Sequence, residues 1–169
     1  INKAVFPGSQ GGPLMHVIAA KALAFKEAMT DEYKAYQKQV VENAMELSKV
    51  LIEKDYKILS GGTDNHLVLV DLRNKGLTGK VAEEVLDEIG ITTNKNAVPF
   101  DTESPFVTSG IRLGLPGITT RGLVSADMTE VVEVIDLILM NLDNDEIKAN
   151  CRERVTALCQ RYPLYSTLT

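Results

Sequence analysis

Arg112 is the residue best suited to bind a small anion, and it lies in the run SGIRLG at residues 109–114. An arginine within an apolar strand is costly to bury unless its guanidinium group meets an anion. The planar guanidinium group suits a carboxylate, and the flanking glycines would clear space beside it. The same pattern also fits an internal salt bridge to an Asp or Glu residue. The run therefore predicts either a carboxylate-binding site or a structural ion pair.

A second candidate is the glycine-rich segment Phe6–Pro13, FPGSQGGP, which opens directly into a stretch with helical spacing. Glycine lets backbone N–H groups approach a ligand closely, and proline is well placed at the first helical position. The unpaired N–H groups and the dipole of a helix N-terminus favour an anion such as phosphate. The segment matches neither GxGxxG nor GxxxxGK[ST], so a turn that only enters a helix is an equally simple interpretation.

A third candidate combines Asn94, Lys95 and Asn96 with the loop that contains Ser104–Phe106. Side-chain amides carry both donors and acceptors, so they can recognise the edge of a heterocycle. The alternative is an ordinary surface loop that binds no ligand.

The histidines and cysteines give weaker signals. His16 and His66 have no partner at metal-ligand spacing, and Cys151 and Cys159 lie eight residues apart on one helical face, which suits core packing. No Ser/His/Asp or Cys/His arrangement can be assembled from the sequence. We therefore expect no metal site and no hydrolase.

Composition narrows the class of protein. Apolar residues make up 44% of the 169 residues and charged residues 24%, which is typical of a globular domain and excludes a disordered chain. The net charge is −5 and the basic residues are scattered, so we expect no nucleic-acid partner. The longest apolar run is interrupted by Asp136, so no membrane span is expected. The two isolated cysteines favour a cytoplasmic location. The chain begins with Ile1, which suggests a piece of a longer protein.

Hydrophobic periodicity predicts the elements that must position these residues. Residues 13–51 have helical spacing, as one bent helix or two abutting ones, and form a helical arm without a sheet. The rest predicts about four strands and three helices in a small α/β layer structure. The strands are expected at Tyr56–Leu59, His66–Leu72, Ile91–Thr93 and Ile111–Leu115, and a loop is expected at Ala97–Ser109. The helices are expected to begin at Thr78, Ser125 and about Asp145, and the first of them should stop at Gly90.

Taken together, the motifs resemble serine hydroxymethyltransferase. They are AVFPGSQGGP at residues 4–13, SGGTDNH at 60–66, NKNAVP at 94–99, SPFVTSGIRLG at 104–114, TTRG at 119–122 and RYP at 161–163. The resemblance covers the whole chain in order and corresponds to the C-terminal portion of such an enzyme.

The resemblance implies an enzyme that uses pyridoxal phosphate to move a one-carbon unit between serine and tetrahydrofolate, leaving glycine. It implies the aspartate-aminotransferase-like fold (fold type I) and a dimer or a pair of dimers. Residues 1–55 would then hold the phosphate loop and the arm that ends the large domain. Residues 56–169 would form the small C-terminal α/β domain.

The resemblance also assigns residues. Gly11 and Gly12 would bind the cofactor phosphate of the neighbouring subunit, and Arg112 would hold the amino-acid carboxylate. Asn96 would face the pterin ring of folate, with Ser104, Pro105 and Phe106 near the same ligand.

The same resemblance places the lysine that holds pyridoxal phosphate upstream of this chain. No lysine here, Lys3, Lys21 and Lys95 included, lies in the matching motif, so we expect no catalytic residue in this chain and no activity without the missing N-terminal portion. The alternative is a free-standing, non-catalytic α/β module that binds a ligand through Arg112.

Overall fold

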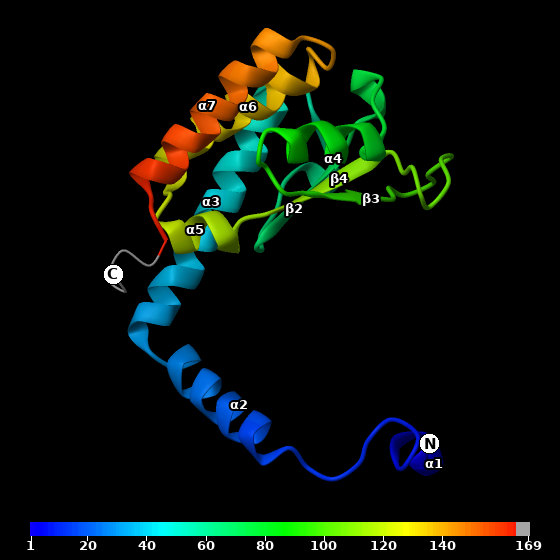
Figure 1. The fold of residues 1–169 in the computed structure, drawn as a ribbon, viewed down its shortest axis with the longest axis vertical. Coiled ribbons are helices and arrows are strands. Elements are labelled where there is room, and N and C mark those ends of the chain that lie inside the picture. The colour runs from blue at the N-terminus through cyan, green and yellow to red at the C-terminus, as the bar shows by residue number, and fades with distance from the viewer. Residues whose placement is uncertain (165–169) are drawn as a thin grey trace. The chain divides into compact units, whose positions relative to one another are not determined.

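The structure is a computed structural model that describes residues 1–164. The chain divides into two compact units, Ile1–Gln37 and a unit that begins at Lys38 (Figure 1). The first unit contains α1 (Asn2–Val5), α2 (Met15–Ala28) and the first residues of α3 (Asp31–Glu53). The second unit contains the rest of α3, all four strands and the remaining helices of the described residues.

Two separate helices follow the glycine-rich segment, which settles the question of one bent helix or two. Helix α2 ends at Ala28, and the Thr30 hydroxyl accepts a hydrogen bond from the Tyr33 N–H at 3.2 Å, so Thr30 caps the start of α3. The prediction for Pro13 was wrong. Helix α2 begins at Met15 after an extended Leu14, so Pro13 lies outside the helix. The short helix α1 was not predicted.

The sheet of the second unit has four antiparallel strands in the order β1-β2-β4-β3. The strands are β1 (Lys57–Ile58), β2 (Leu67–Asp71), β3 (Asn94–Asn96) and β4 (Gly110–Gly114). Three of the expected strands are confirmed, with shifted ends. The strand expected at Ile91–Thr93 was wrong, because the Ile91 N–H closes the end of the preceding helix by donating to the Leu86 carbonyl at 2.9 Å. The polar residues that follow it form β3 instead.

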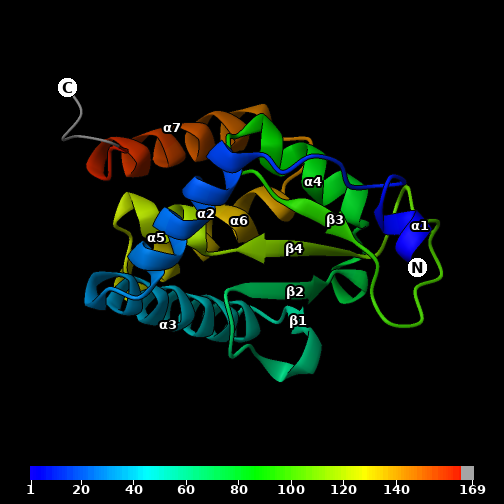
Figure 2. The ribbon, with the colours of Figure 1, turned by 90° about the horizontal axis from the view of Figure 1, so that it is seen from below.

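The two faces of the sheet differ in burial. Val68, Val70, Ile111 and Leu113 alternate onto one face and are buried. Three helices lie on this side: α4 (Gly79–Glu88) contacts β3 and β4, α6 (Met128–Leu139) contacts α4, and α7 (Asp145–Arg161) contacts α6. Figure 2 views the strands from their other, open face. The small α/β architecture expected from the sequence is therefore confirmed.

Helix α4 has both of its predicted ends. The Thr78 hydroxyl accepts a hydrogen bond from the Val81 N–H at 3.3 Å, and Gly90 follows the helix with a left-handed φ of 88°. Between these ends the helix buries Ala82, Val85 and Leu86. The helix therefore covers one side of the core.

The segment after β4 departs from the prediction. Helix α5 (Pro116–Arg121) was not predicted, although proline at its first position is a usual start. Ser125 does not cap α6, because it opens a short 3₁₀ turn, and the Asp127 carboxylate accepts the Val124 N–H at 2.9 Å. The last predicted helix is confirmed as α7. None of the helices in residues 1–164 combines the length and apolar composition that crossing a membrane requires.

Candidate functional site

Arg112 lies at the centre of the open face of the sheet. Strand β4 is an inner strand, and Arg112 pairs with Leu69 of β2 on one side and Asn94 of β3 on the other. Its side chain is exposed, because the strand is apolar only on the face covered by helices. The Nη2 atom donates to the Asn94 Oδ1 atom at 3.3 Å, so Asn94 orients one edge of the guanidinium group.

The structural alternative for Arg112 was an internal salt bridge. Within residues 1–164 its guanidinium group forms no ion pair. The flanking glycines serve different purposes. A side chain at Gly114 would meet no atom within 4 Å, whereas one at Gly110 would lie 2.6 Å from the Val70 carbonyl oxygen. Gly114 therefore leaves space beside the arginine, and Gly110 permits close strand packing.

Asp71 is the acidic residue of β2 on the same face, two positions along the register from Arg112. Its buried carboxylate accepts hydrogen bonds from Arg73, Nε at 2.9 Å and Nη2 at 2.7 Å, and lies 3.3 Å from the Lys57 Nζ atom. These partners, Arg73 foremost, lower the pKa of Asp71 to about 2. Because Asp71 is committed to other cations, Arg112 stays available to an external anion.

Asn96 shares the open face, since it pairs with Gly110 and lies two residues after Asn94. Its Nδ2 atom donates to the Ala97 carbonyl at 2.7 Å. The intervening Lys95 is engaged with Glu83, through both its Nζ atom at 2.6 Å and its backbone N–H at 3.0 Å. The structure therefore brings Asn94, Asn96 and Arg112 together.

The loop between β3 and β4 is held by Asp101, a residue that the sequence analysis missed. Its carboxylate accepts the backbone N–H groups of Val98, Glu103 and Ser109 at 2.9–3.1 Å and the Ser109 hydroxyl at 2.6 Å. The Ser109 hydroxyl, together with these N–H groups, keeps the pKa of Asp101 well below its ordinary value. An aspartate that bonds to the N–H two residues ahead is typical of tight turns, so the pair Asp101 and Glu103 was a usable signal.

This fixed loop exposes the predicted folate-binding residues. Ser104, Pro105 and Phe106 are all exposed, and the Phe106 side chain is 82% accessible. The Ser104 carbonyl accepts the N–H groups of Val107 and Thr108 at 3.0 Å, which closes a turn beneath them. An exposed aromatic ring on an anchored turn is suited to stacking against a flat ligand.

In the first unit, the glycine-rich segment leaves its backbone open. Gly11 and Gly12 are exposed, no atom lies within 4 Å of where their side chains would begin, and their N–H groups bond to nothing in residues 1–164. Leu14 gives the N-terminus of α2 no side-chain cap. Both features suit an anion that binds to backbone N–H groups.

Among the described residues, no cluster of His, Cys, Asp and Glu could hold a metal ion. His16 and His66 are both exposed. The candidate binding groups are therefore the guanidinium group of Arg112, the amides of Asn94 and Asn96, the exposed turn at 104–106 and the backbone N–H groups of Gly11 and Gly12.

A comparison with protein families finds one match that spans these residues. The family model of serine hydroxymethyltransferase matches residues 1–135, which include the glycine-rich segment, the whole sheet and the Asp101 loop. The sequence resemblance agrees with this match. The chain belongs to the serine hydroxymethyltransferase family.

Proposed function

We propose that this chain is the C-terminal portion of a pyridoxal-phosphate-dependent serine hydroxymethyltransferase, which interconverts serine and glycine and transfers a one-carbon unit to tetrahydrofolate. The observation that carries the proposal is the exposed guanidinium group of Arg112, which Asn94 orients and no carboxylate of the described residues neutralises. In this proposal, residues 1–55 end the large domain and residues 56–169 form the small one.

Arg112 binds the carboxylate of serine or glycine. Two parallel N–H donors fix the orientation of a carboxylate, and Gly114 leaves room for the amino acid beside the strand. With the carboxylate held, the reacting carbon of the amino acid has a defined position.

Gly11 and Gly12 hold the phosphate of pyridoxal phosphate bound to a neighbouring subunit in a homo-oligomer. The free N–H groups and open space at these glycines fit a phosphate group. The cofactor supplies an electron sink when bound. We assign the lysine that holds it to the missing N-terminal portion, so we expect the chain alone to be inactive.

Asn96, with Ser104, Pro105 and Phe106, binds tetrahydrofolate. The amide of Asn96 offers a donor and an acceptor to the pterin edge, and the exposed Phe106 ring offers a stacking surface. A free-standing carboxylate-binding module is the second candidate, favoured only by the complete sheet and core of the second unit.

The replacement Arg112→Lys in the complete enzyme tests the carboxylate site. Lysine keeps the charge but loses the planar pair of donors, so serine and glycine affinity should fall by on the order of 2–4 kcal/mol. Equilibrium titration with serine measures the loss. Arg152→Lys on α7, where the arginine side chain donates to the Glu88 carbonyl, is the matched control. Normal serine saturation in Arg112→Lys would refute the proposal.

The replacement Asn96→Ala tests the division between the two substrates. It should weaken tetrahydrofolate binding by about 1–3 kcal/mol, because it leaves a group of the pterin without its partner. Serine binding, followed by the change in cofactor absorbance, should be unaffected. A fall in serine affinity with normal folate affinity would show that the assignment is wrong.

A further inference from the structure

A cavity lies on the helix-covered side of the sheet, within the second unit. Its volume is about 450 Å³, and its walls come from β4, the residues after α4, and helices α5, α6 and α7. Leu113 of β4 lines it, and Leu113 points away from the face that carries Arg112. Apart from Gly114, which leaves space beside Arg112, none of the residues of the proposed serine, folate and phosphate sites lines the cavity.

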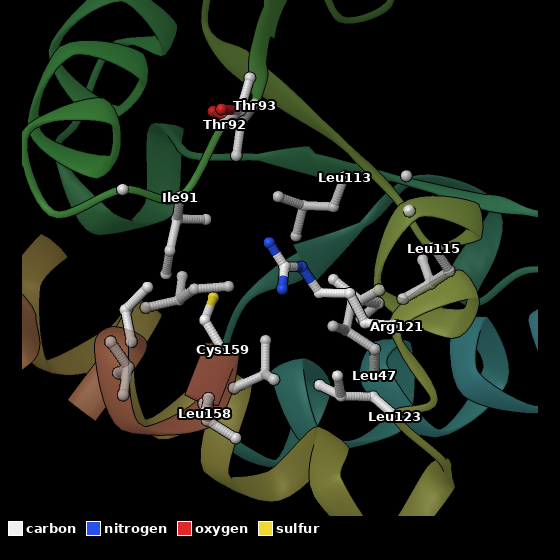
Figure 3. Close-up of a pocket in the computed structure, with 18 of the residues that line it drawn as sticks. Leu47, Ile91, Thr92, Thr93, Leu113, Leu115, Arg121, Leu123, Leu158 and Cys159 are labelled. Carbon is white, nitrogen blue, oxygen red and sulfur yellow. The ribbon is translucent and has the colours of Figure 1, made fainter. Parts of the chain in front are cut away.

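The walls are mostly apolar, with one charged group. Figure 3 shows the guanidinium group of Arg121 pointing into the space between Leu113 and Cys159. Its Nη1 atom donates to the Tyr162 carbonyl at 3.2 Å, and no carboxylate in residues 1–164 pairs with it. Arg121 is half-buried, so its charge is only partly solvated, and an anion that enters the cavity meets a cation with no competing carboxylate among the described residues.

A second wall residue, Thr93, does not add a polar contact for a ligand. Its hydroxyl has no hydrogen bond within the described residues, but its oxygen has almost no exposed surface, so a ligand in the cavity would not reach it. Arg121 is therefore the charged group that a ligand in the cavity would meet.

We propose that this cavity binds a small organic carboxylate with an apolar body and no amino group. The carboxylate pairs with Arg121, and the body packs against Leu113, Leu115 and Leu158. The volume lies in the usual range for small-molecule sites, about 300–1,000 Å³. No Asp or Glu lines the walls, so a zwitterionic amino acid would leave its ammonium group unpaired. This distinguishes the ligand from serine and glycine.

Cys159 allows a direct test, because its thiol lines the cavity and is partly exposed, whereas Cys151 is fully buried. The 169-residue chain is treated with N-ethylmaleimide, and alkylation of each cysteine is followed by mass spectrometry. The probe is 4-phenylbutyrate. The controls are 4-phenylbutan-1-ol, which lacks the carboxylate, and phenylalanine, which adds an ammonium group.

The carboxylate should slow alkylation of Cys159, and neither control should do so at the same concentration. The Arg121→Gln replacement should raise the carboxylate concentration needed to protect Cys159 by about tenfold or more. The Arg121→Lys replacement should keep part of the protection. Arg152→Gln should leave protection unchanged. Thermal unfolding of each variant checks the fold, and if Arg121→Gln does not fold, the wild-type comparison of acid with alcohol still decides.

Three results would overturn the proposal: no protection by the carboxylate, equal protection by the alcohol, or full protection in a folded Arg121→Gln variant. Because Arg112 does not line the cavity, serine titration of Arg112→Lys stays independent of these outcomes.

Discussion

Helices α2 and α4 show how differently two helices of this chain use their apolar residues. Helix α4 buries Ala82, Val85 and Leu86 on one stripe. Helix α2 has 14 residues, many of them apolar, and none of them is buried. Helical spacing therefore predicted both helices, but it did not predict burial, which depends on what each unit places opposite the apolar side chains.

The exposed apolar residues of the first unit suggest a missing partner. They include Leu14, Met15, Ile18, Leu23, Phe25 and Met29. Monomers rarely expose so many large apolar side chains together. We expect this surface to be covered in the assembled protein, by another polypeptide segment or by another subunit, and to promote self-association of the chain alone.

The largest difference between the units should appear when one leucine is truncated in each. Leu86 is fully buried, so Leu86→Ala should lower the free energy of unfolding by about 2–5 kcal/mol through lost burial and a cavity. Leu23 is 59% exposed, and Leu23→Ala should change the free energy of unfolding by less than about 0.5 kcal/mol. Urea titration at low protein concentration measures both. A similar loss in the two variants would contradict the division into units.

The next largest difference between the units should be the dependence of their stability on acidic pH. The pKa of Asp71 is lowered to about 2 by Arg73 and Lys57, below the value of about 3.9 in an unfolded chain. The unfolded state therefore binds the proton first, and the stabilisation by Asp71 is complete above about pH 4 and lost as pH falls toward 2. After a discount for solvent screening, about 1 kcal/mol is involved.

Unfolding measured between about pH 5 and pH 2 checks this window. Asp71→Asn should remove part of the pH dependence. Asp31→Asn, which breaks an exposed ion pair with Lys34 in the first unit, should leave the curve unchanged. If the wild type and Asp71→Asn showed the same dependence of stability on pH, the interaction of Asp71 with Arg73 and Lys57 would not contribute the expected acid-sensitive stability.

The smallest expected difference concerns helix caps. Thr78 caps α4 and Thr30 caps α3, each by accepting a backbone N–H. Thr78→Ala should cost about 1 kcal/mol of stability, because α4 covers the core. Thr30→Ala should only fray the first turn of α3, which lies in the first unit, and should change global stability by a few tenths of a kcal/mol at most. Thermal unfolding followed by circular dichroism compares the two.

The sequence predicted elements whose signals are local. Thr78 and Gly90 bound α4 as expected, and the apolar alternation of β2 was sufficient to place it. The sequence placed the third strand at Ile91–Thr93 and not at Asn94–Asn96. The position of this strand is set by its pairing with β4, whereas the Ile91 N–H closes the end of α4. No local pattern reports which of two neighbouring segments pairs with a distant strand.

The candidate site was predictable in residue type but not in environment. Chemistry alone singled out Arg112 and the run Asn94–Asn96, and the family resemblance selected Asn96 from that run; the structure places Arg112 and Asn96 on one face. The sequence left open whether Arg112 binds a ligand or forms an internal ion pair, because the choice depends on what faces the side chain of Ile111 and what faces that of Arg112 across the sheet. Asp101 was missed because its role depends on Ser109, eight residues away.

The absence of burial along α2 has a consequence for proteolysis. A helix of 14 residues is marginally stable by itself in water, and α2 buries nothing within its unit, so its backbone opens at little cost in free energy. Lys21 and Lys26 lie on this helix and are exposed, so trypsin should cut there before it cuts at Lys95, which is paired with Glu83 in the sheet. The first stable product should begin within α2 and keep the whole sheet, with the core of the second unit intact.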